Sequence, residues 1–187
     1  MSDEKKKEVE VPTLESQHYF LLAKEIESSS AEEVMKFILE RNLMDDKPSE
    51  IRLIIHSAGG ETQSAFAITD VIEASSIPVY TYGLGNLQSA ALAIFIAGDK
   101  GHRYLTKNTS ILSHQFSWGT SGKEHDLYAG NKEINLTTKR IFDHFKKHTK
   151  QPEKVIRKTL LPPSDVWLTA NEAVKYGCAD VIMKAFG

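Results

Sequence analysis

The chain contains a single cysteine, Cys178, among its 187 residues, so an internal disulfide is excluded. A lone cysteine suits a reducing compartment, and no neighbour in the sequence would make this thiol reactive. The longest apolar run, over residues 90–98, is too short to span a bilayer. The opening segment MSDEKKKEVEVP lacks the apolar stretch of a secretory signal. We therefore expect a cytoplasmic protein without a membrane partner.

An excess of one charge is absent as well. The formal net charge is −2, from 23 basic and 25 acidic residues that are interspersed along the chain. This balance gives no reason to expect a nucleic-acid partner. Residues 1–17 are charged and contain no aromatic residue, which predicts a flexible N-terminal tail. The remaining residues, 18–187, are enough for one domain with a hydrophobic core.

Short aliphatic runs alternate with helical patterns along this domain. The run IRLIIHS (51–57) is typical of a parallel strand buried on both faces, and PVYTYG (78–83) predicts a second strand. The second strand leads into an apolar stretch over 83–98, which predicts a buried helix with Ser89 in its first turn. This alternation predicts an α/β fold with right-handed crossovers. A long helix over about 124–149 has apolar residues on several sides, so we expect it to pack on another subunit.

The sequence contains a serine, a histidine and an aspartate, in that order, that could together form a nucleophilic site. Ser89 follows the second strand, His114 ends a later strand, and Asp165 lies in a loop between two predicted helices. A serine attacks a carbonyl only when a base removes its proton, and a carboxylate must then orient the imidazole. Each residue also has a plain structural interpretation: Ser89 as a helix cap or core hydroxyl, His114 as a hydrogen-bonded strand end, and Asp165 as a turn residue.

Two glycine-flanked strand ends offer backbone N–H groups to the same site. Gly59 and Gly60 follow the first strand, where glycine frees the backbone to expose its N–H groups. Ala90 directly follows Ser89 and is small enough to leave room for a substrate carbonyl. We expect the N–H groups of Gly60 and Ala90 to form an oxyanion hole.

The sequence around these residues resembles the proteolytic subunit of the Clp protease, ClpP. LIIHSAGG (53–60) resembles the family's strand that ends in Ser-Pro-Gly-Gly. GNLQSAALAIFIAGDKGHRYLTKNTSILSHQ (85–115) resembles its stretch from the nucleophile motif to a His-Gln pair. DVWLTANEAVKYGCAD (165–180) resembles the segment that begins at its catalytic aspartate. Together the resemblance covers residues 18–184.

The resemblance implies a fold and an activity. The fold is a spiral of βαβ units of the ClpP and crotonase type with a protruding handle helix. The activity is that of a serine endopeptidase, which cleaves unfolded polypeptides or peptides through an acyl-enzyme intermediate. Ser89 falls on the family's nucleophile, His114 on its base and Asp165 on its orienting acid. No cofactor is implied.

The resemblance also implies an assembly. Family members form seven-subunit rings, which stack in pairs around a chamber, and residues 115–149 match the handle between two rings. Peptide substrates would bind as an added strand beside Gly59, Gln115 and Phe116. Residues 1–17 do not resemble the family's first helix and axial loop, so the sequence leaves open whether an AAA+ unfoldase is a partner.

Two other functions stay open on the sequence. Leu87 and Gln88 replace a small pair before the nucleophile, which leaves room for a ring subunit that serves as a scaffold without activity. A crotonase-fold acyl-CoA enzyme would use the pair of N–H groups without any nucleophile, and would leave the match at Ser89 unexplained.

A metal site is not expected. His144 and His148 lie four residues apart on the long helix, a spacing that can bind a metal. Their neighbours Lys146 and Lys147 are charged, which predicts a plain pair of histidines on the surface.

Overall fold

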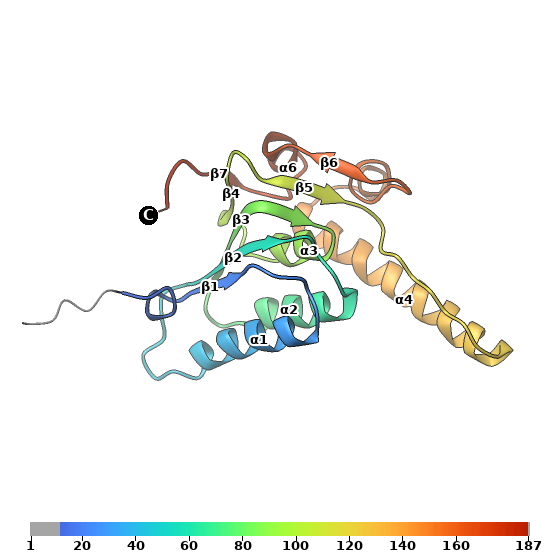
Figure 1. The fold of residues 1–187 in the computed structure, drawn as a ribbon. Coiled ribbons are helices and arrows are strands. Elements are labelled where there is room, and N and C mark those ends of the chain that lie inside the picture. Colours follow the sequence, from blue (N-terminus) through green and yellow to red (C-terminus); the bar gives the residue numbers. More distant parts are fainter. Residues whose placement is uncertain (1–11, 187) are drawn as a thin grey trace, which may run out of the picture.

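The computed structural model describes residues 12–186, in which strands and helices alternate along most of the chain (Figure 1). The strands are β1 (Tyr19–Leu22), β2 (Ile51–Ser57), β3 (Val79–Gln88), β4 (Arg103–Leu105), β5 (Ser110–Ser113), β6 (Val166–Leu168) and β7 (Val181–Ile182). The helices are η1 (Glu15–Gln17), α1 (Ser28–Asn42), α2 (Thr62–Ala74), α3 (Ala90–Ile96), α4 (Glu124–Thr149), α5 (Glu153–Val155), η2 (Ile156–Leu160) and α6 (Ala170–Lys175). The predicted α/β class is confirmed.

The predicted tail over residues 1–17 falls mainly outside the described residues. Its last part, Glu15–Gln17, forms the short 3-10 helix η1. The Glu15 carboxylate lies 3.4 Å from a guanidinium nitrogen of Arg41 on α1, so this turn is joined to the domain by an ion pair. The hydrophobic core is one cluster that extends from Leu22 to Ala179. In residues 12–186 no helix is both long and apolar enough to cross a membrane.

Five strands form a parallel path in the order β1-β2-β3-β4-β7. β3 pairs with two strands along the same edge: its first half pairs with β4, and its last residues pair with β5. β6 then adds antiparallel to β5. The pairing of β2 with β3 has a register irregularity between Ile55 and Ser57. Beyond it, the end of β3 pairs with β5 and no longer with β4.

Strand β2 does not have the environment that its aliphatic sequence predicts. Ile51, Leu53 and Ile55 are at most 1% exposed, but the alternate residue Ile54 is half-buried and His56 is exposed. Burial on both faces was therefore the wrong expectation. The helices cover one face of β2 only, and α1 and α2 lie together on that side (Figure 1).

Helix α4 protrudes from the body of the molecule (Figure 1). Its 26 residues span about 39 Å at 1.5 Å per residue. Residues 124–129 are all exposed, whereas Thr137, His144, Phe145 and Thr149 in the second half are buried. The segment over 114–123 that precedes α4 forms no strand. Helix α4 alone supplies the regular structure of the predicted handle.

Candidate active site

Ser89 lies at the junction of β3 and α3, where the backbone turns sharply. It is the N-cap of α3, with φ 52° and ψ −122°, a conformation that non-glycine residues rarely adopt. Residues 83–88, expected to lead into a helix, continue β3 instead, because Asn86–Gln88 pair with Ser110–Leu112 of β5. Ser89 therefore precedes the helix and does not lie in its first turn. The strained turn presents its hydroxyl beyond the end of the strand.

The antiparallel pairing of β5 and β6 brings the other two predicted residues together. Ser113 pairs with Val166, and His114 and Asp165 are the next residues beyond that pair. His114 Nδ1 lies 3.0 Å from Asp165 Oδ1, and His114 Nε2 lies 2.7 Å from Ser89 Oγ. Side chains from three distant segments thus form one continuous hydrogen-bonded chain.

The order of these groups determines where their protons lie. A carboxylate can only accept, so His114 donates its Nδ1–H to Asp165, and its Nε2 accepts the Ser89 hydroxyl proton. This is the tautomer that a general base for serine requires. The His114 side chain is 26% exposed and that of Asp165 is 62% exposed, so one side of the site is open to solvent.

The backbone of Gly59 packs directly against the turn at Ser89. A Cβ added to Gly59 would lie 2.8 Å from Ser89 Cβ and 3.0 Å from Ala90 N. Gly59 has φ 96°, so a side chain there would also be strained by the backbone itself. Among the described residues, the N–H groups of Gly60 and Ala90 donate no hydrogen bond. Two unpaired N–H donors are therefore available next to the Ser89 turn.

The segments expected to bind substrate differ in what they can offer. The Gly59 carbonyl accepts a hydrogen bond from Ile26 N at 2.8 Å and the Gly59 N–H donates to Ser57 Oγ at 3.1 Å, so both backbone groups already have a partner within the chain. The backbone of residues 115–118 makes no hydrogen bond to other backbone groups of the described chain. The Gln115 side chain donates to Leu161 O at 3.0 Å, and Phe116 packs edge-on against Trp118.

A cavity of about 30 Å³ opens beside Ser89 and His114. It is lined by Thr62, Ala65, Phe66, Ser89, Ala90, Ala93, Ser113, His114, Phe116, Ile141, Phe145 and Leu161. Phe66 of α2 was not predicted for this site, and the apolar residues of the long helix were expected to pack on another subunit. Phe145 of α4 is 3% exposed and packs inside its own chain, so part of the apolar surface of this helix is covered without a second subunit. Only the packing of α2 and α4 against α3 brings these side chains to the site.

The histidine pair of α4 is not on the surface, so that prediction was wrong. His144 is 9% exposed and the His148 side chain is 12% exposed, because α2 and α3 cover this face of α4. His144 Nε2 donates to Ala93 O at 2.7 Å, and His148 Nε2 donates to Glu73 Oε1 at 2.6 Å. Burial, together with the neighbouring His148, lowers the pKa of His144 to about 4, so this ring is neutral at pH 7.

Comparison with known proteins points to one family. The family model described as Clp protease matches residues 3–186. The chain is 32% identical over 181 residues to the ATP-dependent Clp protease proteolytic subunit 1 of Chlamydia pneumoniae, which covers 95% of this chain and 92% of the relative. It is 34% identical over 143 residues to the ATP-dependent Clp protease proteolytic subunit of Paracoccus denitrificans, covering 76% and 71% respectively. A mutant of ClpP1 from Listeria monocytogenes has a similar structure, with a TM-score of 0.80, 28% identity and coverage of 92% and 94%.

Proposed function

The chain belongs to the Clp protease family, and we propose that it is a serine endopeptidase that acts through Ser89, His114 and Asp165. The observation that carries this proposal is the continuous hydrogen-bonded chain from Ser89 Oγ through the His114 ring to Asp165, with distances of 2.7 and 3.0 Å. Core packing does not require this arrangement, because the Asp165 side chain is 62% exposed.

The proposed reaction is acyl transfer in two halves. His114 Nε2 removes the Ser89 proton as Oγ attacks the scissile carbonyl, and the carbonyl oxygen gains the negative charge. The protonated His114 then gives its proton to the leaving amine as the C–N bond breaks. A water molecule, deprotonated by His114 in turn, attacks the ester and restores the Ser89 hydroxyl. Asp165 accepts the hydrogen bond from His114 Nδ1–H throughout, and its negative charge stabilises the imidazolium.

The N–H groups of Gly60 and Ala90 would hold the oxyanion. Both lack a hydrogen-bond partner among the described residues, and the close packing of Gly59 on Ala90 N places the two peptide segments side by side. Such donors are fixed before the reaction and stabilise charge that develops only in the transition state.

The substrate we propose is an extended polypeptide with an apolar residue before the cleaved bond. The walls of the cavity beside Ser89 are mainly apolar and include Phe66 and Phe145, while its volume of about 30 Å³ favours a small side chain over an aromatic one. The unpaired backbone of residues 115–118 can accept a substrate strand.

Assembly into rings is part of the same proposal. Residues 124–129 of α4 are exposed. The apolar side chains of Tyr128 and Leu136 on this helix are 70% and 47% exposed, and exposed apolar surface favours contact with another protein. We propose that α4 mediates contacts between copies in heptameric rings, stacked or single. Cytoplasmic location remains a prediction from the sequence, which leaves open whether an AAA+ unfoldase is a partner.

The test uses the assembled protein and two serine variants. Hydrolysis of a fluorogenic peptide and labelling by a fluorophosphonate probe are measured for wild type, Ser89→Ala and Ser121→Ala. Ser121 is the matched control, because it is an exposed serine outside the segment proposed to bind substrate. We expect Ser89→Ala to lose labelling and hydrolysis while its native mass by light scattering stays that of the wild type, and Ser121→Ala to keep all three.

The same measurements separate the alternatives. Undiminished labelling of Ser89→Ala would end the assignment of the nucleophile. An assembled wild type that is neither labelled nor active would favour the scaffold function. A probe adduct on Ser89, identified by intact mass and peptide mapping, argues against an acyl-CoA enzyme that uses no nucleophile.

A further inference from the structure

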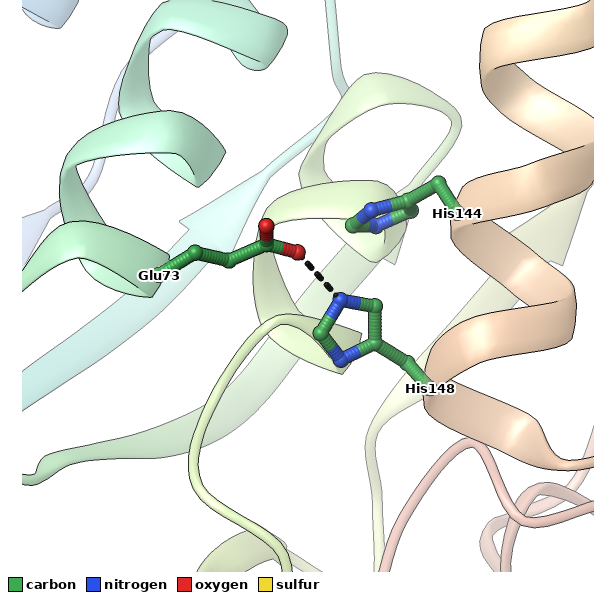
Figure 2. A group of neighbouring side chains, drawn as sticks. All are labelled: Glu73, His144 and His148. Atoms are coloured by element: carbon green, nitrogen blue, oxygen red, sulfur yellow. Dashed lines mark hydrogen bonds and ion pairs between the residues drawn. The ribbon is translucent and has the colours of Figure 1, made fainter.

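Glu73, His144 and His148 form a cluster apart from the proposed active site. Glu73 comes from α2 and the two histidines from one face of α4, as Figure 2 shows. One ligand atom from each of the three lies within 4.8 Å of the others. Two imidazoles and one carboxylate are a donor set that binds first-row divalent metals in proteins, zinc among them.

The His144 ring is held as a metal-ligating histidine usually is. Its Nε2 donates to the Ala93 carbonyl at 2.7 Å, which fixes the ring and leaves Nδ1 with the lone pair. Among the described residues, Nδ1 has no hydrogen-bond partner. A ligating histidine commonly donates its other N–H to a backbone carbonyl, which fixes both its tautomer and its orientation.

Glu73 and His148 are already in contact. His148 Nε2 donates to Glu73 Oε1 at 2.6 Å, and the second carboxylate oxygen pairs with Lys147 Nζ at 2.7 Å. Coordination through His148 Nε2 requires its proton to move to Nδ1 or to solvent. Glu73 and His148 also line an open cavity of about 430 Å³, so a hydrated cation has a path to them.

We propose that Glu73, His144 and His148 bind one zinc ion, with water in the remaining coordination position. Bonds of about 2.0–2.1 Å place tetrahedral ligand atoms roughly 3.4 Å apart, so separations of up to 4.8 Å must shrink by at most about 1.4 Å. Rotation of the partly exposed Glu73 side chain supplies this movement. The bound ion would join α4 to α2 directly and to α3 through the His144–Ala93 hydrogen bond. This inference does not depend on the proposed peptidase activity.

The test is a titration of metal-free protein without an affinity tag. Co²⁺ is the probe, followed by its visible absorption, and Zn²⁺ is then added to displace it. We expect one Co²⁺ per chain and a rise in melting temperature with Zn²⁺. Glu73→Gln and His148→Gln should each weaken Co²⁺ binding by about tenfold or more, because the loss of even an outer partner weakens a metal site by about 10–100-fold.

Two controls exclude other binding sites. His125→Gln removes an exposed histidine of the same helix, which lies 3.2 Å from the Asp126 carboxylate, and it should leave the titration unchanged. His114→Ala removes a second histidine that contacts a carboxylate, that of Asp165, and it should also leave Co²⁺ binding at Glu73, His144 and His148 unchanged. Binding that is lost only with His114→Ala, or that falls equally in His125→Gln and Glu73→Gln, would overturn the proposal.

Wild-type protein gives an independent answer if a variant fails to fold by circular dichroism. X-ray absorption of the Co²⁺-loaded wild type should show two imidazole ligands and one carboxylate. The absence of bound Co²⁺, or a spectrum without imidazole scattering, refutes the site.

Discussion

Replacing Gly59 by alanine should disable the proposed oxyanion hole while leaving the three polar side chains in place. A Cβ at this position would lie 2.7 Å from Gln88 O, 2.8 Å from Ser89 Cβ and 3.0 Å from Ala90 N. Two of these are backbone atoms on either side of Ser89, so no side chain can rotate away to make room. Relief to an ordinary contact of 3.4 Å requires a movement of about 0.7 Å between the two segments.

The magnitude follows from what that movement separates. Gly60 is the next residue, so its N–H would shift with respect to Ala90 N–H and no longer point to the same oxygen. Loss of one oxyanion donor lowers kcat by about 10²–10³-fold, or about 2.7–4 kcal/mol. We expect Gly59→Ala to lower kcat by about 10²-fold. Its free energy of unfolding should fall by about 1–2 kcal/mol for the positive φ, and by about 1–3 kcal/mol more for the overpacking.

Gly101 supplies a matched control. It has φ +95°, close to the +96° of Gly59, but a Cβ there would meet nothing within 4 Å. Gly101→Ala therefore carries the backbone strain without the clash at Ser89. Peptide hydrolysis and urea unfolding are measured on both variants. If Gly59→Ala keeps a kcat within threefold of Gly101→Ala, the Gly59 segment does not position an oxyanion donor and the reasoning fails.

Three further outcomes are expected. Asp165→Asn should lower kcat for the fluorogenic peptide by about 10⁴-fold, because the amide can donate to His114 and favour the wrong tautomer. Asp180→Asn should lower the free energy of unfolding by about 3–5 kcal/mol in urea, since it leaves Arg103, which is 1% exposed, without its counter-charge. Burial raises the pKa of Asp180, but hydrogen bonds from Arg103 and Lys100 outweigh the effect of burial and hold the pKa well below its usual range. The stability from this pair is therefore complete above about pH 4 and is lost as the pH falls further. In Asp180→Asn the free energy of unfolding should depend less on pH below about pH 4. Burial raises the pKa of Cys178 to about 12, so iodoacetamide should modify this thiol only after unfolding.

The helices and strands that depend on local pattern were predictable. The long helix was expected over about 124–149 and α4 is Glu124–Thr149, because its amphipathic repeat extends over the whole segment. The strand over 51–57 is likewise β2. The error at 83–88 has a tertiary cause, since the stretch GLGNLQ, with two glycines, has no strong preference of its own. Pairing with β5 decides that it is a strand, and pairing between distant segments leaves no mark in a local window.

The candidate site also has a part that was predictable from the sequence and a part that was not. Ser89, His114 and Asp165 were predictable because their residue types carry chemistry and the sequence around each resembles the Clp protease family. The structure places them within hydrogen-bond distance. The cavity beside them was not predictable. Phe66 and Phe145 are apolar residues on two different helices, and nothing in either helix alone says that its neighbour will be α3 rather than another chain.

The buried histidines show where a local argument misleads. Lys146 and Lys147 are exposed, as their charge predicts, yet they lie between His144 and His148 in sequence. Successive helical residues are about 100° apart around the axis, so Lys146 is turned away from the face that His144 and His148 share, and Lys147 lies at the edge of that face. Charged neighbours therefore say little about the exposure of an i, i+4 pair. The contacts that decide it, from Ala93 on α3 and from Glu73 on α2, exist only once the chain has folded.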